Sequence, residues 1–323
     1  MKIRMISPAP SRSLYGNSIT SLRWQGILEE LGHRVEVTQK YGGEPCDLLV
    51  ALHAKKSSQA VFRFREAYHD KPIIVALTGT DVYRDMRLSA RARRAIGLAT
   101  RLIVLQPLAV QELPPGMRRK ARVIFQSAEK TDNAKNRSSR FFDVCVVGHL
   151  RAVKDPFRAA YASRLLPAGS KIRVFHLGDA RDRALAAKAR TEQNRNPRYR
   201  WLGSKSHAET LRHIAASRLL VLSSRMEGGA NVISEAVANR VPILASRIPG
   251  TLGLLGRYYP GYFPVGDTRS LADLLLKSEQ DRAFYSRLKA HCSTLAPLFR
   301  PSYEKQAWME LLEELRLKAS RVE

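Results

Sequence analysis

The sequence has few cysteines and no long apolar run, and both shortages exclude whole classes of protein. Its 3 cysteines, Cys46, Cys145 and Cys292, stand far apart, without the spacing that disulfide frameworks and zinc sites need. No apolar stretch approaches the ~20 residues of a membrane-spanning helix, and residues 1–8 are too short and too early interrupted for a secretory signal. We therefore expect reduced thiols in the core, no transmembrane segment and a cytoplasmic protein.

Acidic residues are also scarce. The chain carries 29 Asp and Glu against 55 Lys and Arg, for a net charge of +26. Nucleic acid is the first partner that such a charge suggests. However, residues 1–140 and 141–323 share the excess equally, and basic clusters such as 91–94 have no nucleic-acid module or aromatic platform beside them. We expect a solvated basic surface that gathers small anions, and no nucleic-acid partner.

Short apolar runs alternate with helix-like segments along the whole chain, which is the pattern of βαβ units. One helix, closed by Gly32, carries Trp24, Ile27, Leu28 and Leu31 at helical spacing. The pattern predicts an α/β protein. The expected strands are 2–6, 33–38, 48–52, 73–77, 101–105 and 123–125, and then 143–147, 173–177, 199–202, 219–222 and 242–245.

A chain of 323 residues suggests two domains. The stretch 127–140 is polar and cannot bury a face, so we place a linker there. Residues 1–130 are expected to form one Rossmann-like domain, 131–140 the linker, and 141–299 a second Rossmann-like domain. The closing helix within 300–323 carries Trp308 among apolar residues at helical spacing, and we expect it to pack back on the first domain.

The most informative segment is 223–236, which spaces Glu227 and Glu235 eight positions apart around Gly228 and Gly229. The run 219–222 before it reads as a buried strand, so the segment would lie at the carboxyl edge of a sheet, where ligands bind. If a helix starts near Asn231, its first N–H groups and its dipole attract phosphate. The alternative is a glycine turn and an amphipathic helix whose two acids are only solvated.

This segment closely resembles the E-x7-E element of the retaining nucleotide-sugar glycosyltransferases of family 4, which have two Rossmann-like domains with a cleft between them, the GT-B fold. The resemblance covers most of residues 141–250. It implies that Glu227 lies near the donor sugar and that Glu235 holds the nucleotide ribose. Donor binding would also involve the residues of the helix start, which are Gly228, Gly229, Ala230 and Asn231.

A second turn, 148–156, follows the expected strand 143–147 and should lie at the same edge. Family members carry a G-R-L turn here, with a lysine a few residues on that helps to hold the diphosphate. Lys154 matches that lysine, His149 stands where the arginine is expected, and Arg151 can supply the guanidinium. The alternative is a pair of surface cations. Gly203 lies in the turn that passes the nucleotide base in the family.

In the first domain the resemblance places Gly16 and Asn17 in the loop that meets phosphates or the acceptor. Thr78 stands where many members have a histidine near the reacting carbon. Threonine cannot replace imidazole as a base at neutral pH. Thr80 belongs to the same acceptor segment, and Asp81 is the acidic candidate there. His53 lies at a nearby strand end and is either functional or a satisfied structural histidine.

Taken together, these turns resemble a narrower group of family 4-like enzymes, the selenosugar synthases of selenoneine biosynthesis. The resemblance implies transfer of N-acetylglucosamine or glucose from a UDP-sugar to selenophosphate, with formation of a carbon–selenium bond. Glu227, Lys154, Arg151 and Asp81 would act in catalysis, and neither a metal nor a cofactor is expected. Two alternatives stay open. One is an ordinary retaining transferase that uses an alcohol acceptor of a lipid or polysaccharide, and the other is a non-enzymatic basic binding protein.

Overall fold

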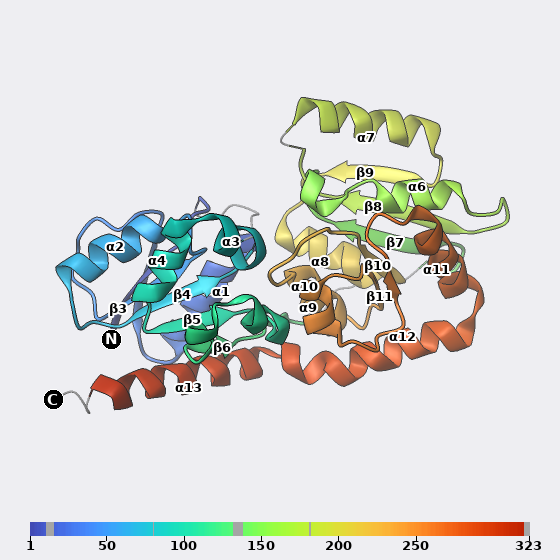
Figure 1. The fold of residues 1–323 in the computed structure, drawn as a ribbon. Helices are drawn as coiled ribbons and strands as arrows, with labels where there is room; N and C mark the ends of the chain where they lie inside the picture. The colour runs from blue at the N-terminus through green and yellow to red at the C-terminus, as the bar shows by residue number, and fades with distance from the viewer. Residues whose placement is uncertain (11–15, 80, 132–137, 181, 320–323) are drawn as a thin grey trace. The chain divides into compact units, whose positions relative to one another are not determined.

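The computed structural model describes residues 1–10, 16–79, 81–131, 138–180 and 182–319. The chain divides into two compact units (Figure 1). The first unit consists of Met1–Gln126 with Pro301–Glu323, and the second consists of Ser127–Arg300. Each unit contains one parallel sheet of six strands.

The first sheet has the order β2-β1-β3-β4-β5-β6, and every neighbouring pair is parallel. The chain runs from β1 to β2 in one direction across the sheet and from β3 onward in the other. The carboxyl ends of β1 and β3 therefore flank a change in direction, which is where ligands bind in such sheets. The strands are β1 (Lys2–Ile6), β2 (Arg34–Thr38), β3 (Leu48–Leu52), β4 (Ile73–Leu77), β5 (Arg101–Val104) and β6 (Ala121–Val123).

Helices cover both faces of this sheet, so the two middle strands, β3 and β4, are apolar at every position. In β3, Leu48, Val50 and Leu52 belong to one buried cluster, whereas Leu49 and Ala51 belong to the other. Successive side chains of a strand point to opposite faces, which explains this alternation. The helices are α1 (Gly16–Glu30), α2 (Ser58–Ala67), α3 (Met86–Leu88), α4 (Ala90–Leu98), α5 (Pro115–Arg118) and α13 (Pro301–Ala319), with shorter turns η1 (Asp81–Asp85) and η2 (Pro107–Glu112).

Helix α13 completes the core of the first unit together with α1. The Trp24 and Trp308 rings meet edge to face with centroids 5.0 Å apart. The Glu304 carboxylate, fully buried, accepts hydrogen bonds from Trp24 Nε1 at 2.7 Å and Arg23 Nε at 2.9 Å. A buried carboxylate without such donors would be costly. The apolar and polar contacts therefore fix α13 on α1.

The second sheet has the order β12-β11-β10-β7-β8-β9, again with parallel pairs only. Right-handed crossovers that move in opposite directions place their helices on opposite faces. Accordingly, α6 and α7 cover one face, and α8 and α9 cover the other (Figure 1). The strands are β7 (Phe142–Val147), β8 (Ile172–Leu177), β9 (Tyr199–Gly203), β10 (Leu219–Leu222), β11 (Ile243–Ser246) and β12 (Tyr262–Phe263).

The remaining elements of the second unit connect these strands or follow them. The helices are α6 (Arg158–Arg164), α7 (Arg183–Arg195), α8 (His207–Ala216), α9 (Asn231–Ala238), α10 (Pro249–Leu255), α11 (Thr268–Gln280) and α12 (Arg282–Leu295), with short turns η3 (Ala152–Lys154) and η4 (Ala296–Phe299).

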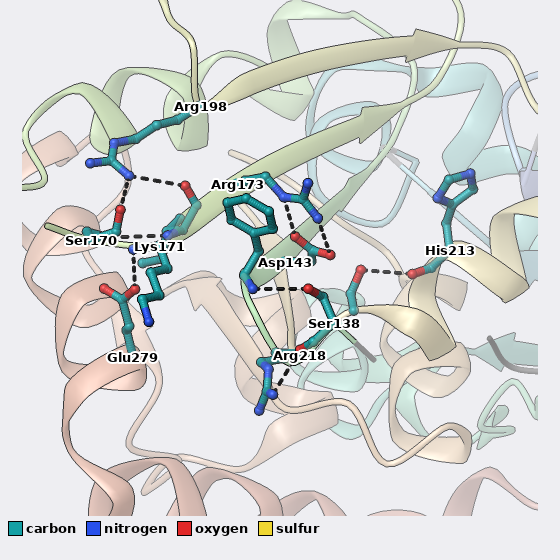
Figure 2. Close-up of polar contacts among 12 residues, drawn as sticks. Ser138, Asp143, Ser170, Lys171, Arg173, Arg198, His213, Arg218 and Glu279 are labelled. Carbon is teal, nitrogen blue, oxygen red and sulfur yellow. Dashed lines mark hydrogen bonds and ion pairs between the residues drawn. The ribbon is translucent and has the colours of Figure 1, made fainter. Parts of the chain in front are cut away.

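The amino edge of the second sheet is closed by structural polar contacts (Figure 2). Arg173 on β8 makes a two-point contact with Asp143 on β7, with N–O distances of 2.8 and 2.9 Å. Arg218 donates to the carbonyl of Ser138, and the backbone N–H of Lys171 donates to Glu279. These contacts tie the first residues of β7 and β8 to neighbouring segments, whereas the loops that follow the strands lie at the opposite, carboxyl edge, where ligands bind in open α/β sheets.

The sequence pattern predicts ten of these strands close to their observed positions, and the α/β prediction is confirmed. Gly32 adopts the left-handed φ of +81° expected of a helix-terminating glycine. One predicted strand is misplaced, and one observed strand is missing from the prediction. The sixth strand is Ala121–Val123 rather than 123–125, and β12 has no counterpart in the prediction. None of the helices in the part of the chain that the structure describes is long and apolar enough to cross a membrane.

The first unit should lose stability in acid through Glu314 on α13. The hydrogen bond and charge of Arg101, helped by Arg122, lower the pKa of Glu314 from 4.5 to about 2. A carboxylate with a lowered pKa stabilises the folded state above its unfolded pKa, and this contribution is lost as the pH falls toward 2. Glu314→Gln should therefore unfold at lower urea concentration than the parent at pH 7, and the difference should shrink steadily below pH 5.

Urea titrations of a Trp201→Phe background measure this, because the other two of the 3 tryptophans, Trp24 and Trp308, lie in the first unit. The matched control is Glu310→Gln on the exposed side of the same helix. A Glu314→Gln difference that stays constant from pH 7 to pH 3 would contradict the assignment.

Candidate functional site

The carboxyl ends of β7 and β10 form the centre of the candidate site. These strands are hydrogen-bonded neighbours, with Val144 opposite Leu219 and Val146 opposite Val221. The chain leaves β7 toward β8 and leaves β10 toward β11, in opposite directions across the sheet. The loops 148–155 and 223–230 therefore separate at the point where ligands bind in open α/β sheets.

Helix α9 begins at Asn231, as predicted, directly after the glycine pair. Its cap residue is Ala230, which makes no side-chain hydrogen bond to the helix start. Alanine cannot accept from the first N–H groups in the way that serine or aspartate does. This end of α9 therefore keeps the attraction for an anion that a capping carboxylate would reduce.

Glu227 and Lys154 meet although they come from different loops. Glu227 Oε1 accepts from Lys154 Nζ at 2.5 Å and from Ser224 Oγ at 2.5 Å. Glu227 is 9% exposed, so its charge is largely removed from water and the ammonium group balances it. The expectation that the two turns lie at the same sheet edge is confirmed by this ion pair.

Further hydrogen bonds join the two loops at the backbone. Ser223 Oγ lies 3.2 Å from the carbonyl of Lys154 and 2.9 Å from that of Asp155, and the N–H of Arg225 donates to the carbonyl of Val153. Asp155 has a left-handed φ of +43°, and its carboxylate accepts from Arg158 Nε at 2.9 Å. The Lys154 backbone is thus held at the site by neighbours on both sides.

The backbone of Glu227 is also held by a close contact with Gly250 at the start of α10. A Cβ at this glycine would lie 2.1 Å from the carbonyl oxygen of Glu227. No real Cβ makes such a contact, so only glycine lets α10 approach the acid-bearing loop this closely. Ser246 adds a hydrogen bond of 2.5 Å to the carbonyl of Ser224.

Glu235 lies one turn into α9, with 6% of its surface exposed. Its Oε1 is 3.0 Å from Nε2 of His207, the first residue of α8. No motif in the sequence singles out His207. Its position shortly after the Gly203 turn could have indicated it, because that turn lies at the same carboxyl edge of the sheet as the loop of Glu227.

The loop after β7 rests on the loop after β8. His149 Nδ1 accepts from the N–H of Asp179 at 3.1 Å, so its ring is directed at that loop. Gly178 allows the close approach, because a Cβ there would lie 2.0 Å from the carbonyl oxygen of Gly148. Arg151 is exposed, and within the described residues its guanidinium has neither an ion-pair nor a hydrogen-bond partner. The side chain is thus available to an anionic ligand.

His176 supports this loop as a neutral imidazole. Burial lowers its pKa to about 4. Its Nε2 lies 3.0 Å from the carbonyl of Gly148, and its Nδ1 lies 3.0 Å from the Tyr199 hydroxyl. A carbonyl can only accept, so Nε2 carries the proton and Tyr199 donates to Nδ1. Gly203, with φ +66°, accepts at its carbonyl from the N–H of Gly178.

The predicted acceptor residues lie in the first unit. Gly16 is the exposed first residue of α1, and the carbonyl of Asn17 accepts from Ser7 Oγ at 3.4 Å. Thr78 directly follows β4, and its buried Oγ1 has no hydrogen-bond partner in the described part of the chain. Thr80 lies outside the described residues.

Asp81 is fully buried, and both of its carboxylate oxygens accept backbone hydrogen bonds. Oδ2 accepts from the N–H of Ala54 at 2.9 Å, and Oδ1 from that of Gly79 at 2.8 Å. His53, with a strained φ of +69°, lies 3.8 Å from Asp81 and 3.9 Å from Asp85. Asp81 therefore holds the loops after β3 and β4 together.

Residues 127–292 match the family described as "Glycosyl transferases group 1". Among solved structures, HepE of Anabaena with UDP and glucose is 17% identical over 97% of this chain and 100% of its own, with a TM-score of 0.74. Sucrose-phosphate synthase of Thermosynechococcus elongatus is 15% identical over 98% and 100%, with a TM-score of 0.80.

A glycosyltransferase of Rickettsia africae is 12% identical over 97% of this chain and 98% of its own, with a TM-score of 0.73. No curated protein matches the sequence. At such low identities the likeness concerns the fold, and it confirms the prediction of two Rossmann-like units of the GT-B type.

Gly250→Ala tests the support beneath Glu227. The new methyl group would collide with the Glu227 backbone, so we expect the second unit to lose about 1–3 kcal/mol of stability. Gly169→Ala is the matched control, because a Cβ there meets nothing within 4 Å, and its effect should stay within about 0.5 kcal/mol. Hydrogen exchange of the backbone amides of the second unit, followed by mass spectrometry at increasing urea concentration, measures both, because Trp24 and Trp308 of the first unit would contribute to a fluorescence signal. Equal stability of the two variants would contradict the close approach.

Proposed function

Because the chain belongs to the group 1 glycosyl transferases, it is an enzyme that transfers a glycosyl unit, and we propose that its donor is a UDP-sugar bound by the second unit. The Lys154–Glu227 pair carries this proposal, since it places one cation and one carboxylate at the sheet's change of direction. The structures of HepE with UDP and with UDP-glucose support the choice of nucleotide. Family membership also speaks against the alternative of a non-enzymatic binding protein.

The donor diphosphate would lie against Lys154, Arg151 and the start of α9. Arg151 is exposed and can swing to the phosphate oxygens, and Lys154 already stands at the turn. When the bond between the anomeric carbon and the diphosphate oxygen breaks, its electron pair goes to UDP. Cations positioned there before the reaction stabilise this charge, which is commonly the largest catalytic effect.

Glu227 would act on the sugar side of the same bond. Its Oε1 is occupied by Lys154 and Ser224, whereas Oε2 has no hydrogen-bond partner among the described residues. The second oxygen can accept from sugar hydroxyls, and the negative charge stabilises the positive charge that develops at the anomeric carbon. Glu235 would accept from the ribose hydroxyls. His149 and the Gly228–Asn231 segment would complete the donor site.

For the acceptor, we propose selenophosphate, with N-acetylglucosamine or glucose as the transferred sugar. Three features support this: the resemblance of the turns to the selenosugar synthases, Thr78 in the place of a histidine base, and the net charge of +26. Selenium attacks the anomeric carbon, and UDP leaves. Water then cleaves the phosphorus–selenium bond, giving the selenosugar and phosphate. An anionic selenium nucleophile needs no general base, unlike an alcohol.

Lys154→Met and Glu227→Gln test the donor site. Each should lower the rate of UDP release from a UDP-sugar about 100-fold or more, because each removes a charge facing the developing transition state. Lys171→Met and Glu279→Gln are the matched controls, since both residues lie at the opposite, amino edge of the sheet (Figure 2). UDP release is measured by a coupled assay. Rates within about threefold of the parent for Lys154→Met or Glu227→Gln would contradict the assignment.

The acceptor proposal is tested by products. Incubation with UDP-N-acetylglucosamine or UDP-glucose and selenophosphate should yield a selenosugar, with UDP and phosphate in equal amounts, as detected by mass spectrometry and phosphate analysis. The control replaces selenophosphate with phosphate. Rapid turnover with an alcohol acceptor and no selenosugar would instead favour the lipid or polysaccharide alternative.

A further inference from the structure

We propose that His207 positions Glu235 for the ribose of the donor nucleotide, so that ribose recognition depends on a histidine at the start of α8. This inference rests on the proposed UDP-sugar site and adds a residue to it. His207 is a positioning residue in this proposal, because it acts through the Glu235 carboxylate.

The contact joins α8, which follows β9, to α9, which follows β10, although β7 and β8 lie between those two strands in the sheet. His207 Nε2 lies 3.0 Å from Glu235 Oε1, and α8 packs against α9. The Glu235 side chain is 8% exposed, whereas the His207 side chain is 44% exposed. The acid is thus nearly withdrawn from water, and the histidine reaches it from the solvent side.

One carboxylate oxygen of Glu235 is used and the other is open. A carboxylate accepts, so the proton of this hydrogen bond is carried by His207 Nε2. Within the described residues Oε2 of Glu235 has no hydrogen-bond partner. Oε2 is therefore available to a ligand, and a hydrogen bond to a charged carboxylate is stronger than one between neutral groups. Ribose hydroxyls are donors of the required kind, and a ligand that supplies them completes the hydrogen bonding of the acid.

The backbone of His207 is held firmly enough to position another side chain. Ser206 caps α8, with its Oγ accepting from the N–H of Glu209, and Glu209 accepts in return from the N–H of Ser206. Such a reciprocal cap fixes the first turn of a helix. Glu235 is fixed as well, since its carbonyl accepts from Asn239 Nδ2 at 2.8 Å. With both backbones fixed, the imidazole determines where the carboxylate points.

The test compares two ligands that differ only in the groups Glu235 would recognise. Calorimetry measures the Kd of UDP and of 2′,3′-dideoxy-UDP for the full chain and for His207→Ala. We expect His207→Ala to raise the Kd of UDP about fivefold to tenfold. The Kd of the dideoxy nucleotide should rise less than about twofold. With a UDP-sugar, KM should rise while kcat stays nearly constant, as for a loss of uniform binding.

Two further variants separate positioning from folding. His207→Gln retains an N–H donor and should bind UDP within about threefold of the parent. His213→Gln, on the last turn of the same helix, should leave both Kd values unchanged. It is a suitable control because its backbone carbonyl accepts from Ser217 Oγ at the opposite sheet edge (Figure 2).

The outcomes that overturn the inference are distinct from failure of the proposed function. If His207→Ala weakened the binding of UDP and of dideoxy-UDP by the same factor, His207 would not act through the ribose hydroxyls. If the variant bound UDP as tightly as the parent, His207 would have no role in binding. In both cases the parent still binds UDP and the proposed donor stands. A parent chain that binds neither UDP nor a UDP-sugar would overturn both proposals.

Discussion

Strands β7 and β10 are neighbours in the second sheet, although β8 and β9 come between them in the chain. This pairing forces the chain to leave the two strands in opposite directions, so the loops that follow them open away from each other over a shared edge. The residues that we propose for the donor site depend on that geometry. Lys154 comes from one loop, Glu227 from the other, and Glu235 from the helix that continues the second loop.

The electrostatics follow from the same geometry. Glu227 is nearly buried, and a buried charge is tolerated only with a partner. Lys154 supplies that partner from the loop after the neighbouring strand. Only Oε1 of Glu227 accepts hydrogen bonds, and Oε2 has no partner among the described residues. A diphosphate would compete with Glu227 for the ammonium group, and sugar hydroxyls would compensate the carboxylate. Binding of the whole donor therefore exchanges one set of paired charges for another, whereas binding of either part alone leaves a group unpaired.

The sequence predicts this site to the extent that local pattern determines it. The acid spacing around Gly228 and Gly229 places the start of α9 correctly, because glycine before a helical apolar pattern limits where the helix can begin. Alternating apolar runs locate most strands for a similar reason. The two-residue strand β12 could not be predicted, because so short a run shows no hydrophobic periodicity.

Contacts between distant loops could not be predicted in this way. Gly250 is needed because α10 presses on the Glu227 carbonyl, and no local pattern reveals that distance. His207 and Glu235 come together through the packing of α8 on α9. Asp81 reads as a candidate acid in the sequence. Only the fold reveals that two backbone N–H groups hold its carboxylate.

Helix α13 has a consequence for the order in which the protein forms. The first unit buries Trp24 against Trp308, and Glu304 satisfies Trp24 Nε1. During synthesis, residues 1–126 leave the ribosome long before 301–317, so the part of the first sheet and of α1 that α13 covers stays exposed while the whole second unit is made. Domains usually fold as their sequences emerge. Here the second unit can be complete before the first, and the nascent first unit is the species that most needs protection from aggregation.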